Sequence, residues 1–422
     1  MGSSCSAFVD ACKRFLRHRE PSTRALLPFL LFVTIAAVPA NAASPCVPER
    51  VASPLEGPCT IGDLTFILPY PASESTASRH TSASSYTITD LGTLGGTESF
   101  AYAINDPGQI VGKSRLPGDT STHDFLYRKG ELTDLSPLDS GNIQTGWPTG
   151  INDDGLIASG VVVGGIYYPA LFDSMTGEIT LLGSFGGLFF GEFTGVATSV
   201  NKYGQAAGYS YLDSLNRHAF LYSDGVMTDI GSFGGYSFAL GINDFGTIVG
   251  TSSELVNGVG HAFIYSQGAM TEINPFGSLR NESSARGINN RGQVVGEALT
   301  NAGNGFRGFV YRAGTITDVG TLDGGRNSYA FALNERGQVV GIADRPYVST
   351  CWDPIGGYVP CTRYIQRAVL YDNSELKDLN SLIPADSGWD LSWAFGINNR
   401  GQIIGYGLYK DRFRAFVLTP VR

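Results

Sequence analysis

Three observations on this 422-residue sequence predict an all-β fold, a seven-bladed β-propeller of four-stranded antiparallel blades. Short motifs recur seven times in a fixed order, at spacings close to the length of one propeller blade. One strand of the last copy is missing at the C-terminus, but a matching strand precedes the first copy. The composition agrees, because 55 Gly and only 16% charged residues suit short strands joined by tight turns.

The first motif is an apolar stretch ending in Asn, followed three positions later by Gly and then by a β-branched run, as in AINDPGQIVG at 103–112. Asn caps turns and Gly readily adopts a positive φ, so the motif predicts a hairpin. Successive Asn residues are 47, 49, 42, 46, 45 and 64 positions apart. The seven are Asn105, Asn152, Asn201, Asn243, Asn289, Asn334 and Asn398.

Two further motifs complete each blade: an aromatic strand such as HAFLY at 218–222, and a strand such as MTDIG at 227–231. Seven aromatic strands follow the Asn motifs, but only six Thr-Asp strands do. The missing one is found at 86–91, so we predict that it pairs with 414–418 and that this N-terminal strand closes the last blade. An open β-solenoid, the alternative, would not need this permuted strand.

Residues 1–42 have the organisation of a secretory signal peptide: a basic region, an apolar run at 25–40 and an A-x-A cleavage site at Ala40–Ala42. The alternative, an uncleaved anchor, is disfavoured because the run is short and contains two Pro residues. We expect an extracellular or periplasmic protein with no membrane span after cleavage. Residues 43–85 would form a small disulfide-closed segment and a Ser/Thr/Ala-rich linker, or a propeptide, and 86–422 the propeller.

Four cysteines follow the signal peptide, an even number that indicates disulfides in an exported chain. Local pairing would join Cys46 to Cys59 and Cys351 to Cys361. A metal site is the rival interpretation, but no C-x-x-C or Cys/His cluster occurs, so we expect no metal and no cofactor.

The run HAFLYSDGVMTDIGSFGGYSFALGINDFGTIVG at 218–250 resembles the bacterial HAF-type extracellular repeat family, named for its His-Ala-Phe triplet. The resemblance covers residues 86–422. It implies secretion and a propeller, and it implies no established chemistry.

His123, His218 and His261 occupy one position of the repeat, and each has an acidic residue 11 positions later. Arg307 and Arg367 follow the same rule, and Arg414 would pair with Asp90 of the closing strand. We interpret these as pairs that hold a blade together, since catalytic groups would converge at one place. The Asn152–Gly155 turn lacks the spaced ligands of a calcium loop, so no catalytic or metal-binding residue is predicted.

The net charge of −9 argues against nucleic acid, which requires a basic surface. Function is therefore sought in the variable loops, which contain the Trp residues, because Trp in polar loops marks contact surfaces. We predict a monomeric, non-enzymatic binding module for an extracellular glycan or partner protein, on the loop-rich face around blades six and seven. The predicted contact residues are Trp147, Tyr347, Trp352, Tyr358, Arg363, Trp389, Asp390 and Trp393.

Two alternatives stay open. The long loop at 341–366 could bury its own aromatic residues as a small hydrophobic cluster. The protein could also be an enzyme, a polysaccharide lyase or glycoside hydrolase, with its site at the channel mouth on the same face. The polar groups available for catalysis there are Asp344, Arg345, Asp353, Arg363, Asp386, Asp390, Lys410, Asp411 and Arg412.

Overall fold

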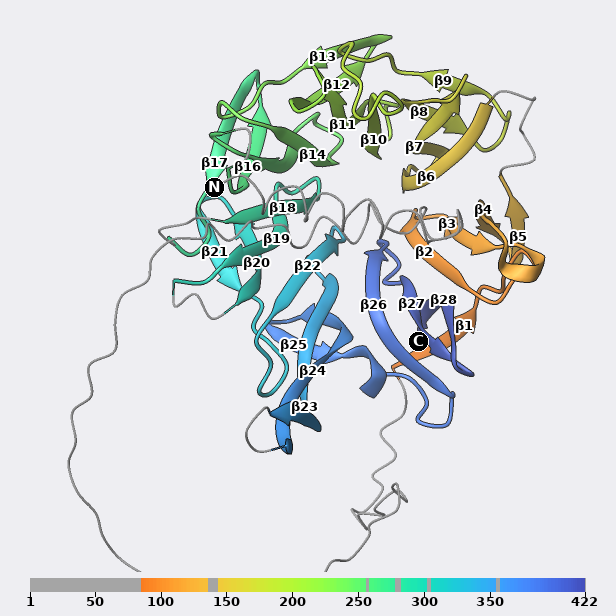
Figure 1. The fold of residues 1–422 in the computed structure, drawn as a ribbon, viewed down its shortest axis with the longest axis vertical. Coiled ribbons are helices and arrows are strands. Elements are labelled where there is room, and N and C mark those ends of the chain that lie inside the picture. Colours follow the sequence, from red (N-terminus) through yellow and green to blue (C-terminus); the bar gives the residue numbers. More distant parts are fainter. Residues whose placement is uncertain are drawn as a thin grey trace, which may run out of the picture. The chain divides into compact units, whose positions relative to one another are not determined.

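The computed structural model describes residues 85–135, 143–255, 258–277, 282–301, 305–353 and 357–421. In these ranges the chain forms seven antiparallel four-stranded sheets, arranged as blades around a common centre (Figure 1). The predicted all-β, seven-bladed propeller is therefore confirmed. The predicted signal peptide, Cys46 and Cys59 lie outside the described residues, as does the 43–85 segment except for Ser85.

Each blade contains four strands, and the first strands of neighbouring blades contact one another all around the ring, so they are the innermost. Blade 1 contains β2 (Ser99–Ile104), β3 (Ile110–Arg115), β4 (Thr122–Arg128) and β5 (Glu131–Asp134), and blade 2 contains β6 (Ile143–Ile151), β7 (Leu156–Val163), β8 (Ile166–Asp173) and β9 (Ile179–Leu181). Blade 3 contains β10 (Gly195–Val200), β11 (Ala206–Tyr211), β12 (Arg217–Ser223) and β13 (Val226–Asp229), and blade 4 contains β14 (Ser237–Ile242), β15 (Ile248–Ser252), β16 (His261–Ser266) and β17 (Ala269–Ile273).

The last three blades carry the closing strand and a long ribbon. Blade 5 contains β18 (Ser283–Ile288), β19 (Val294–Leu299), β20 (Phe306–Arg312) and β21 (Thr315–Asp318). Blade 6 contains β22 (Ser328–Leu333), β23 (Val339–Asp353), β24 (Gly357–Asp372) and β25 (Glu375–Asp378), and blade 7 contains β26 (Trp389–Ile397), β27 (Ile403–Tyr409), β28 (Arg412–Pro420) and β1 (Tyr86–Asp90). Two short 3-10 helices, η2 (Pro117–Asp119) and η4 (Leu379–Ser381), complete the described elements.

The ring is closed by the N-terminal strand, as the motif count predicts. β1 pairs antiparallel with β28, with Ile88 opposite Leu418 and Asp90 opposite Phe416. The last blade therefore contains strands from both ends of the propeller sequence, and its outermost strand position is filled.

Asn side chains link the seven blades head to tail. The Nδ2 of Asn105 donates to the backbone carbonyl of Asn152 at 2.8 Å, and the same bond recurs from blade to blade until Asn398 donates to Asn105 at 3.0 Å. The Oδ1 of each Asn accepts backbone N–H groups of its own turn, as Asn201 does from Tyr203 and Gln205 at 3.0 Å. One residue type thus builds the turn and connects the blades.

The motif contains two glycines, and each is required for a different physical reason. The Gly three positions after each Asn has a positive φ, between 70° and 88°, as expected for this turn. The Gly at the end of the β-branched run is needed because a carbonyl lies against it: a Cβ on Gly250 would meet the oxygen of Phe238 at 1.9 Å. Equivalent clashes occur at Gly112, Gly208, Gly296, Gly341 and Gly405.

Every innermost strand has a β-bulge, and in the six blades with these glycines the bulge accompanies the close approach. The register shifts at the residue three positions before Asn, for example at Tyr102 between Ala101 and Ala103. Blade 2 has a longer irregularity, between Gly146 and Gly150. A bulge changes the direction of a side chain, and here it leaves one residue per blade outside the regular strand pairing. These seven bulged residues are Tyr102, Thr149, Thr198, Leu240, Arg286, Phe331 and Phe395.

The aromatic strand motif supplies the hydrophobic core between blades. Phe220 of β12 is fully buried and packs among Ala158 and Leu171 of blade 2. Burial of a Phe side chain contributes about 1.5–3 kcal/mol relative to exposure, so these residues dominate the packing of one blade on the next. Phe125, Phe263, Phe309 and Phe416 are equally buried at the same position.

We expect Asn201→Asp to lower the free energy of unfolding by about 1–3 kcal/mol, because the acceptor for the turn is kept while an oxygen replaces the Nδ2 that donates to Asn243. Urea unfolding measures this, with Asn373→Asp at an exposed turn as the control. Equal stability of Asn201→Asp and the unaltered chain would show that the bond between blades contributes nothing.

Candidate ligand-binding site

Four of the predicted basic–acidic pairs form. In blade 3, Phe220 lies opposite Asp229, so the His218–Asp229 pair is diagonal across the two outer strands, as expected. The pairs are spread around the ring and do not converge, in agreement with a structural role. The pairs and their separations are His123–Asp134 at 2.8 Å, His218–Asp229 at 2.9 Å, His261–Glu272 at 2.9 Å and Arg414–Asp90 at 3.0 Å.

Two other predicted pairs are wrong. Arg367 contacts Asp390 of the next blade, while Asp378 accepts the backbone N–H of Asn380 at 2.9 Å and so caps η4. Asp318 accepts the backbone N–H of Gly320 at 2.7 Å, and no Arg307–Asp318 ion pair occurs among the described residues. Asp390, a predicted contact residue, is therefore engaged by Arg367, although its side chain is still 40% exposed.

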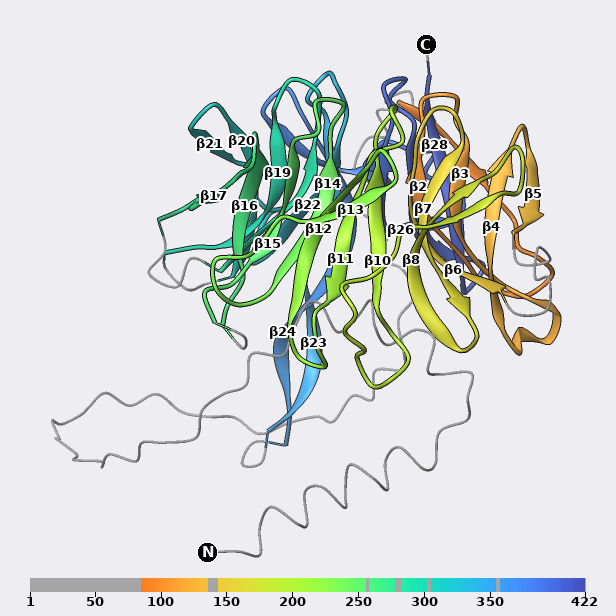
Figure 2. The ribbon, with the colours of Figure 1, turned by 90° about the horizontal axis from the view of Figure 1, so that it is seen from above.

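The segment predicted as a long loop at 341–366 is a two-stranded ribbon, so that prediction is wrong. β23 and β24 stay paired from Val339 opposite Tyr371 out to Asp353 opposite Gly357. Figure 2 shows this ribbon projecting from the face opposite to the end of β28. We call the ribbon side the loop face and the side of the Asn turns the turn face. The predicted Cys351–Cys361 disulfide forms across the ribbon and is confirmed.

The outer part of the ribbon is protected against further strand pairing. Beyond Ala343, β23 has only β24 as its neighbour. β23 contains Pro346 and β24 contains Pro360. Pro has no backbone N–H, so each strand lacks one donor that a further strand could pair with. These two prolines disfavour the pairing of a further strand with the ribbon. Tyr347 and Arg363 are exposed there, while the side chains of Trp352 and Tyr358 lie outside the described part.

All four Trp residues belong to strands, which corrects the prediction that they lie in loops. Trp389 and Trp393 are in β26, Trp147 is in β6 and Trp352 is in β23. The reason is strand length: β6 and β26 have nine residues and extend further from Asn than the motif indicates. The Trp147 side chain lies outside the described part of the chain.

Trp389 has the surroundings of a packing residue. Its ring stacks on Tyr409 with centroids 4.8 Å apart and meets Phe416 edge-on at 6.0 Å. It is partly buried against the core between blades 6 and 7, which includes Leu391. These contacts give Trp389 a packing role within blade 7, and they do not involve the aromatic residues of the 341–366 segment.

Trp393 belongs to a different group, an aromatic wall on β22, β26 and β2, the innermost strands of blades 6, 7 and 1, and on β27 and β28 of blade 7. Its ring lies parallel to Phe331 at 5.6 Å and to Tyr406 at 6.0 Å. Most of these rings are only half-buried. We define the aromatic wall as Phe100, Tyr102, Tyr329, Phe331, Trp393, Phe395, Tyr406 and Phe413.

The wall ends at an arginine in blade 5 that sequence reasoning missed. Arg286 lies 5.3 Å from the centroid of Phe331 and makes two bonds of 2.6 Å to Glu297. Arg286 is a bulged residue, so the series Arg286, Phe331, Phe395 and Tyr102 runs through four successive blades. Blades 2–4 carry Thr149, Thr198 and Leu240 at that position.

This asymmetry is the evidence for a site. The fold accepts Thr or Leu at the bulge, with the hydroxyls of Thr149 and Thr198 donating to backbone carbonyls of the next blade at 2.7 and 2.9 Å. Aromatic residues and an ion pair are therefore not required there by the architecture. Alignment of the seven repeats upstream of Asn would have revealed Arg286 from sequence.

Electrostatics at this end of the wall are set by burial and by Glu297. Burial alone would lower the pKa of the Arg286 guanidinium, but the adjacent Glu297 carboxylate outweighs this and raises it. Burial, and then the negative charges of Glu297 and Asp344, raise the pKa of Tyr329 to about 12. Both groups therefore keep fixed protonation states at neutral pH: a cation and a neutral hydroxyl.

A second buried ion pair borders the wall in blade 1. Lys113 lies 3.1 Å from Asp124, and their side chains are 13% and 2% exposed. Asp124 stands where the other six blades have Ala or Gly, so it too departs from the repeat. Burial, together with Tyr406 and Asp124, raises the pKa of Tyr102 well above its ordinary value.

Three of the polar groups considered for catalysis have partners of their own. Asp344 is buried and accepts from Asn327 at 2.6 Å, and Arg345 lies 3.8 Å from Asp378. Lys410 lies over the ring of Tyr409 in the β27–β28 turn. Within the described ranges, no group of His, Cys, Asp and Glu side chains could hold a metal ion.

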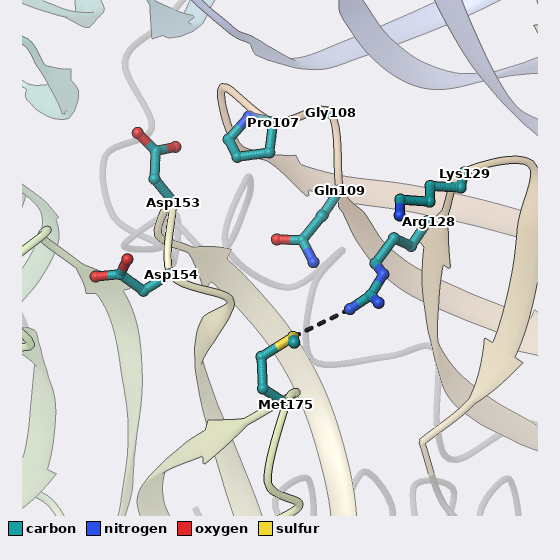
Figure 3. Close-up of a pocket in the computed structure, with 8 residues that line it drawn as sticks. All are labelled: Pro107, Gly108, Gln109, Arg128, Lys129, Asp153, Asp154 and Met175. Carbon is teal, nitrogen blue, oxygen red and sulfur yellow. Dashed lines mark hydrogen bonds between the residues drawn. The ribbon is translucent and has the colours of Figure 1, made fainter.

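A groove of about 430 Å³ lies on the turn face between blades 1 and 2 (Figure 3). Arg128 and Lys129 stand on one wall, and Asp153 and Asp154 on the other. Burial raises the pKa of Asp153, opposed by the N–H of Asp106 that its carboxylate accepts at 2.9 Å. The groove is remote from the ribbon, and none of these residues was predicted as a contact.

No protein-family model matches this sequence, and no curated protein sequence is significantly similar to it. Similar solved structures include TolB from Acinetobacter baumannii, at 13% identity over 60% of each chain with a TM-score of 0.35. Others are the uncomplexed acylaminoacyl peptidase of Pyrococcus horikoshii (11% identity, 77% of this chain and 53% of that one, TM-score 0.43) and the Dos1 propeller (11%, 80% and 94%, TM-score 0.39). This chain spans less than two thirds of the first two, and at such identities these likenesses do not inform its function.

The described helices are single 3-10 turns. None in that part of the chain has the length and hydrophobicity needed to cross a bilayer.

We expect Trp389→Ala to lower the free energy of unfolding by about 2–4 kcal/mol, because it removes a half-buried ring from the core between blades 6 and 7. Trp389→Phe retains a ring and serves as the control, with a smaller loss. Urea unfolding provides the measurement. Unchanged stability of Trp389→Ala, with weaker ligand binding, would instead support the contact role predicted from sequence.

For His218 and Asp229, whose side chains are 22% and 37% exposed, we expect each Ala substitution to cost less than about 1 kcal/mol. The double substitution should cost less than the two single ones added, because both remove the same interaction. A four-protein unfolding cycle measures this coupling. A loss of ligand binding at unchanged stability would contradict the structural role.

Proposed function

We propose that this chain is a non-enzymatic binding propeller, secreted to the extracellular space or periplasm, that holds a glycan against the aromatic wall. The propeller would be of the HAF-repeat type. The observation that carries the proposal is the Arg286–Glu297 pair, held at 2.6 Å beside Phe331 at one end of the wall.

Sugar rings match this arrangement in two ways. Their apolar faces pack on aromatic rings, and the aromatic wall supplies eight rings, most of them half-buried. Their hydroxyl groups both donate and accept, so one hydroxyl can accept from the guanidinium and another can donate to the carboxylate. Arg286 and Glu297 fix each other in position, which reduces the entropy lost when a ligand binds.

The ribbon would extend the site on the loop face. Its disulfide orders the outer strands before a ligand arrives, and Tyr347 is 46% exposed on it. Trp393 lies closer to the loop face than Phe395 on the same strand. A chain of sugars could therefore run from the aromatic wall toward the ribbon. A partner protein on this face is the alternative ligand. In that case the chain would bind no glycan on a glycan array.

The decisive experiment is a glycan array with the purified chain, followed by calorimetric titration of the glycans retained. We expect Phe331→Leu to weaken binding by about 2 kcal/mol, since aromatic anchors dominate binding energy. Leu240→Ala, at the same bulge position in the opposite sector, is the matched control and should bind normally.

The polar contribution is tested by replacing both partners, with Arg286→Met and Glu297→Leu together. Removing both charges of a buried pair is often neutral for stability, whereas removing one leaves the other uncompensated. We expect a folded protein with weakened glycan binding. Unchanged affinity in this variant and in Phe331→Leu, or no retained glycan at all, would contradict the proposed function.

A further inference from the structure

Arg217 lies at the start of β12, where blade 3 meets blade 4 on the loop face. Its guanidinium carbon is 4.5 Å from the ring centroid of Phe238, 5.1 Å from Tyr236 and 5.7 Å from Tyr211. The side chain is half-buried, and the preceding loop exposes Leu212 and Leu215. Three rings from two blades thus hold one cation at the surface.

This cation has no carboxylate partner among the described residues, which distinguishes it from Arg286 and Arg115. Arg286 is bonded to Glu297, and Arg115 to Glu98 at 2.8 Å. A guanidinium has five N–H donors and stays charged at all relevant pH values. Aromatic faces stabilise its charge but accept none of these in-plane bonds. The edge of Arg217 therefore keeps unused donors.

The fold does not require an arginine here. The equivalent positions in the other blades are Thr122, Tyr168, Gly260, Phe306, Gln366 and Phe413, none of them charged. Tyr211, which cradles Arg217, corresponds to Arg115 in blade 1 and Ser253 in blade 4, and Tyr236 corresponds to Glu98 in blade 1 and Glu282 in blade 5. The cation and its aromatic support thus occur together, in blade 3 and the adjoining edge of blade 4.

We propose that Arg217 anchors a carboxylate-binding subsite on the loop face between blades 3 and 4. A planar guanidinium binds a carboxylate through two parallel N–H bonds, and the three rings hold the fork in place before the ligand arrives. The chemical class of ligand is an acidic sugar, a uronic acid. This extends the proposed glycan-binding function, but it concerns residues outside the aromatic wall and is tested separately. Sulfate shares the chemistry, so it is one arm of the test.

The experiment titrates the full chain with sodium glucuronate, with glucose and with sodium sulfate, at ionic strength held constant with sodium chloride. Binding is followed by calorimetry and by the shift in melting temperature. We expect saturable binding of glucuronate that Arg217→Gln weakens at least tenfold. Arg217→Lys keeps the charge but cannot form two parallel bonds, and it should also weaken binding several-fold.

The matched control is Arg326→Gln. Arg326 is also on the loop face and contacts a single ring, that of Tyr364, at 5.0 Å, so its loss changes the net charge equally. It should bind glucuronate normally. If Arg217→Gln does not fold, Arg217→Lys decides.

Four results would overturn the proposal: normal glucuronate binding by the Arg217 variants, an equal loss with Arg326→Gln, glucose binding as tight as glucuronate, or sulfate binding without glucuronate binding. Competition of sulfate with glucuronate on the unaltered chain would support a shared oxyanion site. Phe331→Leu does not touch this subsite, so failure of the aromatic-wall proposal would leave these results unchanged.

Discussion

The hydrogen bond from one Asn side chain to the backbone of the next Asn is the interaction on which the rest of the ring depends. It recurs seven times and returns to its start, from Asn398 to Asn105. Each Asn also fixes its own turn, so the geometry of a turn and the angle between two blades are set by the same side chain. Because this constraint lies on the turn face, the loop face can vary in length and chemistry.

The bulged residue three positions before each Asn varies from blade to blade, although the Asn itself is the same in all seven. The carbonyl beside the bulge requires Gly in the neighbouring strand, which explains the end of the β-branched motif. The bulged side chain itself is not constrained, since Thr198, Leu240, Arg286 and Phe331 all occupy it. A site can therefore be built in one sector without cost to the repeat, and blades 5, 6, 7 and 1 differ from blades 2–4 there.

The sequence was sufficient for the fold because its signals are local and repeated: Asn with Gly three positions later, a buried Phe, and the displaced closing strand. It was insufficient for the site, because strand ends and side-chain neighbours depend on packing. The motif indicated that β26 ends just before Asn398, but not that it begins as far back as Trp389, and so Trp393 was placed in a loop. The 341–366 insertion extends its parent strands as a ribbon, since nothing in it breaks the pairing before Asp353. Arg286 was visible in the repeats, but only by comparing residues before the Asn.

Two arginines, Arg286 and Arg217, lie over aromatic rings, and they differ in whether a carboxylate is bonded to them. Arg286 is neutralised by Glu297, so the pair presents donors and acceptors together and suits uncharged hydroxyl groups. Arg217 is supported by rings and carries no carboxylate bond among the described residues, so its charge is available to an anion. A chain with a net charge of −9 repels anions at long range, and a locally uncompensated cation is what would give an acidic group a preferred position on it. Under the two proposals, the two sectors of the ring would bind different parts of one acidic glycan.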